Sequence, residues 1–82
     1  MKVARVISVY ELKGDELLFE VSISSIPLNI LKKIIPPDED DPELYKIYVL
    51  NRSQVSEFLS FLPQLEKYEL NQVEFHYECY TV

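Results

Sequence analysis

The segment QVEFHYECY, residues 72–80, alternates polar and apolar side chains from Val73 onward. Successive side chains of a β-strand point to opposite faces, so this alternation predicts a strand with one apolar and one polar face. The apolar face holds Val73, Phe75, Tyr77 and Cys79. The polar face holds Glu74, His76, Glu78 and Tyr80, and it is the part of the sequence that bears most directly on function.

The first 24 residues predict an antiparallel β-hairpin. Residues 3–12 alternate and are rich in β-branched residues, and residues 16–24 form a second alternating segment. The apolar side chains of this second segment are Leu17, Phe19, Val21 and Ile23. Gly14, the only glycine of the chain, lies between the two segments. Glycine best tolerates the positive φ of a tight turn, so we expect Gly14 to supply that conformation.

The middle of the chain changes to helical spacing. Residues 26–35 predict a helix that begins near Pro27 and ends at Pro36 and Pro37, because proline cannot continue a helix. Its apolar side chains are Leu28, Leu31, Ile34 and Ile35. An acidic loop follows, and residues 44–50 predict a third strand.

A second helix is predicted within residues 51–62, and residues 64–71 are predicted to form a loop. Asn51 or Ser53 is the expected cap, and Pro63 lies just past the end. One helical face carries Val55, Phe58, Leu59 and Leu62. The final strand is predicted over residues 72–81.

These elements predict an α+β fold of order ββαβαβ. The simplest architecture is an antiparallel sheet of about four strands with two short helices packed on one face. The sequence does not determine the strand order. The other face of the sheet would be open, and Glu74, His76, Glu78 and Tyr80 should lie on it.

The composition is that of one soluble folded domain spanning residues 1–82, with 48% hydrophobic and 27% charged residues. No apolar run approaches the roughly 20 residues that cross a bilayer. The N-terminal residues alternate like a strand and include Arg5, unlike a signal peptide. Cys79 is the only cysteine, so no internal disulfide can form and a cytoplasmic location is predicted.

The net charge of −6 is unevenly distributed. Residues 1–37 hold five bases and four acids, whereas residues 38–82 hold ten acids and three bases. Such a surface repels nucleic acid and anionic membrane and attracts basic partners. We therefore predict a basic protein partner and no nucleic-acid or membrane partner, although acidity can also serve solubility alone.

The polar row in the last strand fits catalysis and metal binding poorly. Alternate strand residues lie about 7 Å apart, and a metal ion needs three or four ligands that converge on it. The chain has one histidine, one glycine, no phosphate-binding loop and no nucleophile elbow. We therefore predict no enzyme activity, no cofactor and no metal site. A solvated face with incidental charges and a recognition surface remain as alternatives.

Recognition is favoured by the six tyrosines, because tyrosine buries area in interfaces while keeping a polar group. The acidic loop at residues 38–43 should extend the negative surface of the sheet. The residues predicted to contact a partner are Asp40, Asp41, Glu74, His76, Glu78 and Tyr80.

From about residue 26 to the end, the sequence resembles immunity proteins of the colicin E3 and cloacin type. The shared pattern is a short apolar helix (LNILKKI), a proline, an acidic loop containing DDP, a stretch of the form V…F…FLP, and a last strand with alternating aromatics (VEFHYECY). The chain departs from the family in lacking tryptophan. The resemblance implies an antiparallel sheet with short helices. It also implies that Asp40, Asp41, Glu74 and Glu78 contact a cognate ribonuclease toxin without catalysis.

The function expected from these observations is stoichiometric neutralisation of a basic bacterial toxin, such as a nuclease, by an acidic sheet face and loop. Two alternatives remain open. One is an inhibitor that mimics nucleic-acid charge to block another enzyme, and the other is a module that forms a homodimer through its open sheet.

Overall fold

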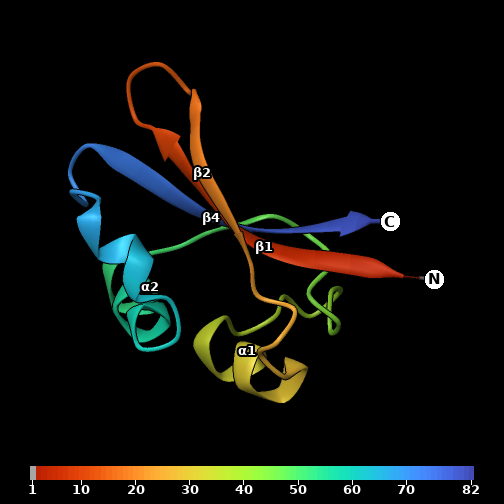
Figure 1. The fold of residues 1–82 in the computed structure, drawn as a ribbon. Helices are drawn as coiled ribbons and strands as arrows, with labels where there is room; N and C mark the ends of the chain where they lie inside the picture. The colour runs from red at the N-terminus through yellow and green to blue at the C-terminus, as the bar shows by residue number, and fades with distance from the viewer. Residues whose placement is uncertain (1) are drawn as a thin grey trace.

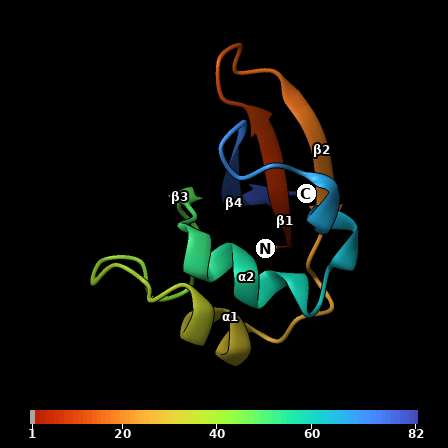
Figure 2. The ribbon, with the colours of Figure 1, turned by 90° about the vertical axis from the view of Figure 1, so that its left-hand side faces the viewer.

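The computed structural model describes residues 2–82 and contains one four-stranded antiparallel sheet in the order β2-β1-β4-β3. Helices α1 and α2 lie together on one side of the strongly twisted sheet (Figures 1 and 2). The elements are β1 (Val3–Glu11), β2 (Leu17–Ser22), α1 (Leu28–Ile34), β3 (Tyr48–Val49), α2 (Arg52–Leu59), the 3₁₀ helix η1 (Pro63–Lys67) and β4 (Val73–Thr81). The predicted α+β fold of order ββαβαβ is confirmed.

The central pair of the sheet joins the two ends of the chain. β1 and β4 are in antiparallel register along their whole length, from Val3 opposite Thr81 to Glu11 opposite Val73. The N- and C-terminal ends therefore lie side by side (Figure 1). Residues directly opposite each other in an antiparallel pair share a face, so this register fixes which β1 side chains accompany the polar row of β4.

The core lies between the sheet and the two helices. β1 contributes Ile7 and Val9, both fully buried, and β4 contributes Tyr77. Leu31 of α1 and Phe58 of α2 are buried against them. The predicted apolar faces of both helices are thus the faces that pack. Removing a side chain such as Phe58 would cost about 3–5 kcal/mol, because the cavity left behind refills only partly.

The β1–β2 turn differs from the sequence expectation. Gly14 does not adopt positive φ, and Asp15 does so instead, with φ of 55°. The turn is closed by hydrogen bonds from the Asp15 N–H and the Glu11 N–H to the carbonyls of Glu11 and Glu16, at 3.0 and 2.8 Å. Aspartate tolerates the left-handed region better than most residues, so Asp15 can supply the positive φ that was expected of Gly14.

The second helix begins as predicted. The Asn51 side chain accepts a hydrogen bond from the Gln54 N–H at 2.8 Å, and the Gln54 side chain accepts one from the Asn51 N–H at 2.9 Å. This reciprocal capping box fixes the helix start. The expectation of a loop after Pro63 was wrong in part, because Pro63 begins η1, whose Leu65 is buried in the core.

The third strand is much shorter than predicted. Residues 44–47 lie outside β3, because the buried Asp41 carboxylate holds them in a turn. It accepts hydrogen bonds from the N–H groups of Tyr45 and Lys46, at 2.9 and 3.0 Å, and from the Tyr48 hydroxyl at 2.7 Å. Leu44 takes a φ of 57° and is fully buried. Side-chain hydrogen bonds to the local backbone have replaced the strand ladder here.

The Asp41 turn predicts an acid-sensitive contribution to stability. Burial disfavours the charged carboxylate, but the three hydrogen bonds outweigh burial and lower the pKa of Asp41. We expect Asp41→Asn to reduce the free energy of unfolding by about 1–3 kcal/mol at pH 7. A lowered folded-state pKa stabilises the protein above the unfolded value of about 3.9, and this stabilisation is lost as pH falls through the folded value. The difference in the free energy of unfolding between wild type and Asp41→Asn should therefore be smaller at pH 3 than at pH 7, as measured by urea denaturation.

Asp40→Asn is the matched control, since Asp40 is exposed and pairs with Lys46 at the surface. Little change in stability is expected for this variant. Equal losses in the two variants would contradict the structural role assigned to Asp41.

Candidate functional site

The face of the sheet that points away from α1 and α2 is called the open face. Its members follow from the register of the four strands. They are Ala4, Val6, Ser8 and Tyr10 of β1, Leu17, Glu20 and Ser22 of β2, Val49 of β3, and Glu74, His76, Glu78 and Tyr80 of β4. All four residues that the sequence placed on an open face therefore lie there together.

Glu78 lies at the centre of a hydrogen-bonded cluster on this face. Its side chain is buried, and its two carboxylate oxygens accept hydrogen bonds from the hydroxyls of Tyr10, at 2.6 Å, and Tyr80, at 2.7 Å. The Tyr80 hydroxyl also lies 3.1 Å from the Glu20 carboxylate. The hydrogen bonds to Glu78 raise the pKa of both tyrosines above the ordinary value, because they favour the neutral phenol.

His76 lies between two carboxylates. Its Nε2 is 2.6 Å from Oε1 of Glu74, its Nδ1 is 4.0 Å from Oε2 of Glu78, and its ring packs against Tyr10 with centroids 4.8 Å apart. The sequence predicted an open row of separated side chains, but the side chains bend toward one another. Tyr10, Glu20 and Ser8 were not predicted as part of this cluster, because their register against β4 is not encoded in any local pattern.

The open face has no basic side chain from any strand to balance its three carboxylates. Arg5 is the only lysine or arginine in the four strands, and it points to the other face. There it donates hydrogen bonds to the Tyr77 hydroxyl at 3.0 Å and to the Glu43 carbonyl at 2.9 Å. Among the strand residues of the open face, His76 alone can balance this negative charge, and only if it is protonated.

The acidic loop does not extend the open face, contrary to expectation. Its backbone is held on the helix side of the sheet by two hydrogen bonds. The Glu43 carbonyl accepts one from Arg5, and the Leu44 carbonyl accepts one from the Tyr77 hydroxyl at 2.6 Å. Asp40 is exposed and pairs with Lys46 at 2.8 Å. Asp41 and Glu78 were both predicted to contact a partner, but the structure buries both carboxylates and uses them in internal hydrogen bonds.

Residues 4–78 match a protein family described as "Domain of unknown function (DUF7683)". The chain belongs to this family. No curated protein and no solved structure matches it. The matched region of this DUF7683 domain contains every predicted contact residue except Tyr80.

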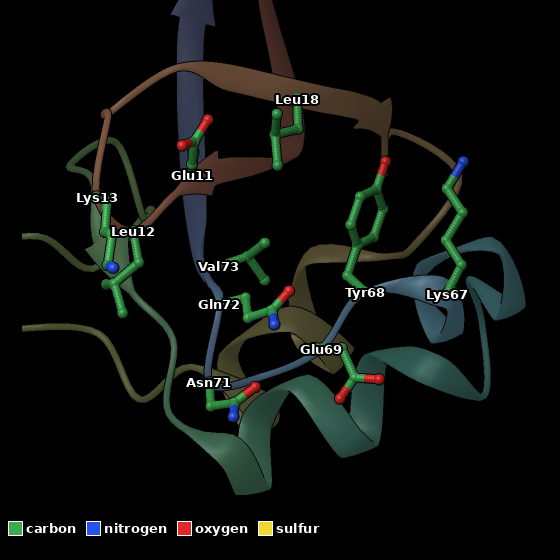
Figure 3. Close-up of a pocket in the computed structure, with 10 residues that line it drawn as sticks. All are labelled: Glu11, Leu12, Lys13, Leu18, Lys67, Tyr68, Glu69, Asn71, Gln72 and Val73. Carbon is green, nitrogen blue, oxygen red and sulfur yellow. The ribbon is translucent and has the colours of Figure 1, made fainter.

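A hollow of this DUF7683 domain lies apart from the open-face cluster, between the β1–β2 hairpin and residues 67–73 (Figure 3). It has a volume of about 490 Å³. Leu12, Leu18, Val73 and Tyr68 give it an apolar wall, and four charged residues lie around its rim. These are Glu11, Lys13, Lys67 and Glu69. No ion pair joins them within residues 2–82, so the hollow offers no paired acid and base.

A smaller hollow of about 210 Å³ borders the open face next to Tyr10, Glu74 and His76. Within the described part of the chain, no group of three or more His, Cys, Asp or Glu residues is arranged to hold a metal ion. In the same residues, no helix combines the length and apolar character needed to cross a bilayer.

The Glu78 cluster predicts a shift in tyrosine ionisation. In wild-type protein, Tyr10 and Tyr80 should lose their phenolic protons only at a pH above the ordinary value of about 10. Glu78→Gln removes the negative charge and should bring both pKa values down toward that value. Ultraviolet absorbance during alkaline titration measures the change.

Glu74→Gln is the matched control, because Glu74 lies on the same strand and face but bonds His76 instead of a tyrosine. A titration curve for Glu78→Gln that coincides with those of wild type and Glu74→Gln would show that Glu78 does not hold the two phenols.

Proposed function

We propose that the protein is an immunity protein that binds and neutralises a cognate basic bacterial toxin, of which a nuclease is the expected kind, through the open face of its sheet. The observation that carries this proposal is the negative charge of that face. Glu20, Glu74 and Glu78 gather there, and no strand supplies a lysine or arginine beside them. The sequence resemblance to colicin E3 and cloacin immunity proteins favours the same conclusion.

The open face has the surface chemistry that a basic partner requires. Opposite charge raises the rate of productive encounters between proteins, and lysine- and arginine-rich surfaces are what nucleases use to hold nucleic acid. Tyr80 is 41% exposed and its hydroxyl is held by Glu78, so its ring is a rigid anchor. Glu78 thus acts by positioning Tyr10 and Tyr80, while Glu20 and Glu74 meet the partner.

In this proposal Asp41 holds its own loop and does not contact the partner. Asp40 lies on the helix side of the sheet. The loop can therefore take part only if the toxin wraps around the β3 edge. A homodimer through the open face is disfavoured, because two copies would bring six carboxylates together. A nucleic-acid-mimicking inhibitor of another enzyme shares the same charge, and the identity of the captured partner decides between it and an immunity protein.

Affinity capture from the native cells tests the proposal. The tagged protein should retain one basic protein with nuclease or other toxin activity at a one-to-one ratio, and a high-salt wash should reduce the amount retained, since salt screens exposed charges. The retained protein should lose its activity when an equimolar amount of the tagged chain is added. Recovery of only the tagged chain, with sedimentation as a dimer that salt does not alter, would refute the proposal.

Charge reversal localises the interaction. Glu20→Lys combined with Glu74→Lys should lower the association rate with the captured toxin by about tenfold or more at low salt, and this effect should shrink at high salt. Glu57→Lys with Glu66→Lys makes the same change in net charge on exposed positions of α2 and η1. Equal effects of the two pairs would mean that overall charge, and not the open face, governs binding.

A further inference from the structure

The centre of the open face holds a buried polar group that makes no hydrogen bond of good geometry. Ser8 lies opposite Glu20 of β2 and opposite His76 of β4, so its hydroxyl points into the acidic cluster. Ser8 is fully buried, and its Oγ makes no hydrogen bond of good geometry within residues 2–82, although the Tyr10 hydroxyl lies close enough to interact with it. Buried polar groups are nearly always paired, because an unpaired one keeps the full cost of losing water.

The surrounding cluster is short of hydrogen-bond donors. Tyr80 has one hydroxyl proton but lies near two carboxylates, Glu78 at 2.7 Å and Glu20 at 3.1 Å. Glu78 is buried, and Nδ1 of His76, a ring that is charged only if protonated, is 4.0 Å away. Buried carboxylates are normally paired with a cation. The acceptor atoms of this cluster therefore outnumber its donors, and no lysine or arginine of the strands balances its negative charge.

We propose that the open face contains a site for a single basic side chain of the partner, centred over Ser8 and bounded by Glu20, Glu74 and Glu78. This inference rests on the proposed function and specifies how the partner is recognised. A lysine ammonium or an arginine guanidinium carries only donors, and it supplies the positive charge and the N–H groups that the cluster lacks. Oγ of Ser8 accepts one of these N–H groups.

The structure also provides room for such a side chain. The hollow of about 210 Å³ beside Tyr10, Glu74 and His76 borders the site and accommodates the aliphatic stem. Tyr80 is 41% exposed, and the hydrogen bonds of its side chain are those of the hydroxyl with Glu78 and Glu20. The cation replaces the Tyr80 hydroxyl at Glu20, while Tyr80 stays bonded to Glu78. The Tyr10 side chain, which reaches past Ser8 to Glu78, moves aside and uncovers the Ser8 Oγ.

The probe for this site is the capped peptide acetyl-Gly-Arg-Gly-amide, with the lysine version beside it and acetyl-Gly-Gln-Gly-amide as the uncharged control. Each peptide is titrated into the isotope-labelled chain, and backbone amide signals are followed by NMR. The basic peptides should give saturable shifts at Ser8, His76 and Glu78, and the glutamine peptide should not. Shifts confined to residues 38–43, or no saturable shift, would overturn the proposal.

Ser8→Ala separates a binding role from a structural role. Because the Ser8 Oγ makes no hydrogen bond of good geometry in the free protein, the variant should melt at the same or a higher temperature than wild type. Its affinity for the basic peptides should nevertheless fall about fivefold, the worth of one hydrogen bond. Ser22→Ala, at an exposed position on the same face, should leave that affinity unchanged.

Wild-type affinity in Ser8→Ala would overturn the proposed site. This result can be told apart from failure of the proposed function. A captured toxin whose association rate still depends on Glu20 and Glu74 would show that the open face binds a basic protein without a specific site at Ser8. Peptide binding that depends on Ser8, without any captured basic protein, would establish the site and refute the immunity function.

Discussion

The antiparallel pairing of β1 with β4 is the constraint on which the other features depend. The register brings Ser8 opposite His76 and Tyr10 opposite Glu74, although these segments lie at opposite ends of the chain. A slip of one residue would move every side chain of one strand to the other face. It would place the apolar row of β4 in solvent and its carboxylates in the core. In the observed register, Tyr77 of β4 is buried on the helix side of the sheet, and this burial raises its pKa to about 12.

The two faces of this pair satisfy their polar groups differently. On the helix side, the Tyr77 hydroxyl accepts a hydrogen bond from Arg5 and donates one to the Leu44 carbonyl, which makes a closed set around Tyr77. On the open face, the hydroxyls of Tyr10 and Tyr80 are the main donors for a group of carboxylates, and the Oγ of Ser8 makes no hydrogen bond of good geometry within residues 2–82. A closed set of hydrogen bonds stabilises the fold, whereas an incomplete set favours the binding of a molecule that supplies the missing donors.

The sequence predicted those features that depend on local patterns. Alternation located β4 and its two faces, and Asn51 was one of the two caps expected for α2. It could not predict Asp41 as the centre of a turn, because in a run of acids nothing distinguishes the one whose carboxylate reaches the backbone of Tyr45 and Lys46. The burial of Glu78 was missed for a related reason. Its neighbours Tyr10 and Tyr80 come from different strands, and only the register brings them together.

Because β1 and β4 are far apart in the sequence, the open face can form only late in folding. Tyr10 and Glu78 are 68 residues apart, so their hydrogen bond forms only after the chain has closed a loop nearly as long as itself. Contacts of such high sequence separation form late in folding and slow it. During synthesis, β1 leaves the ribosome well before β4 and can pair only with β2. The acidic surface is therefore absent from a nascent chain and arises only when folding is complete.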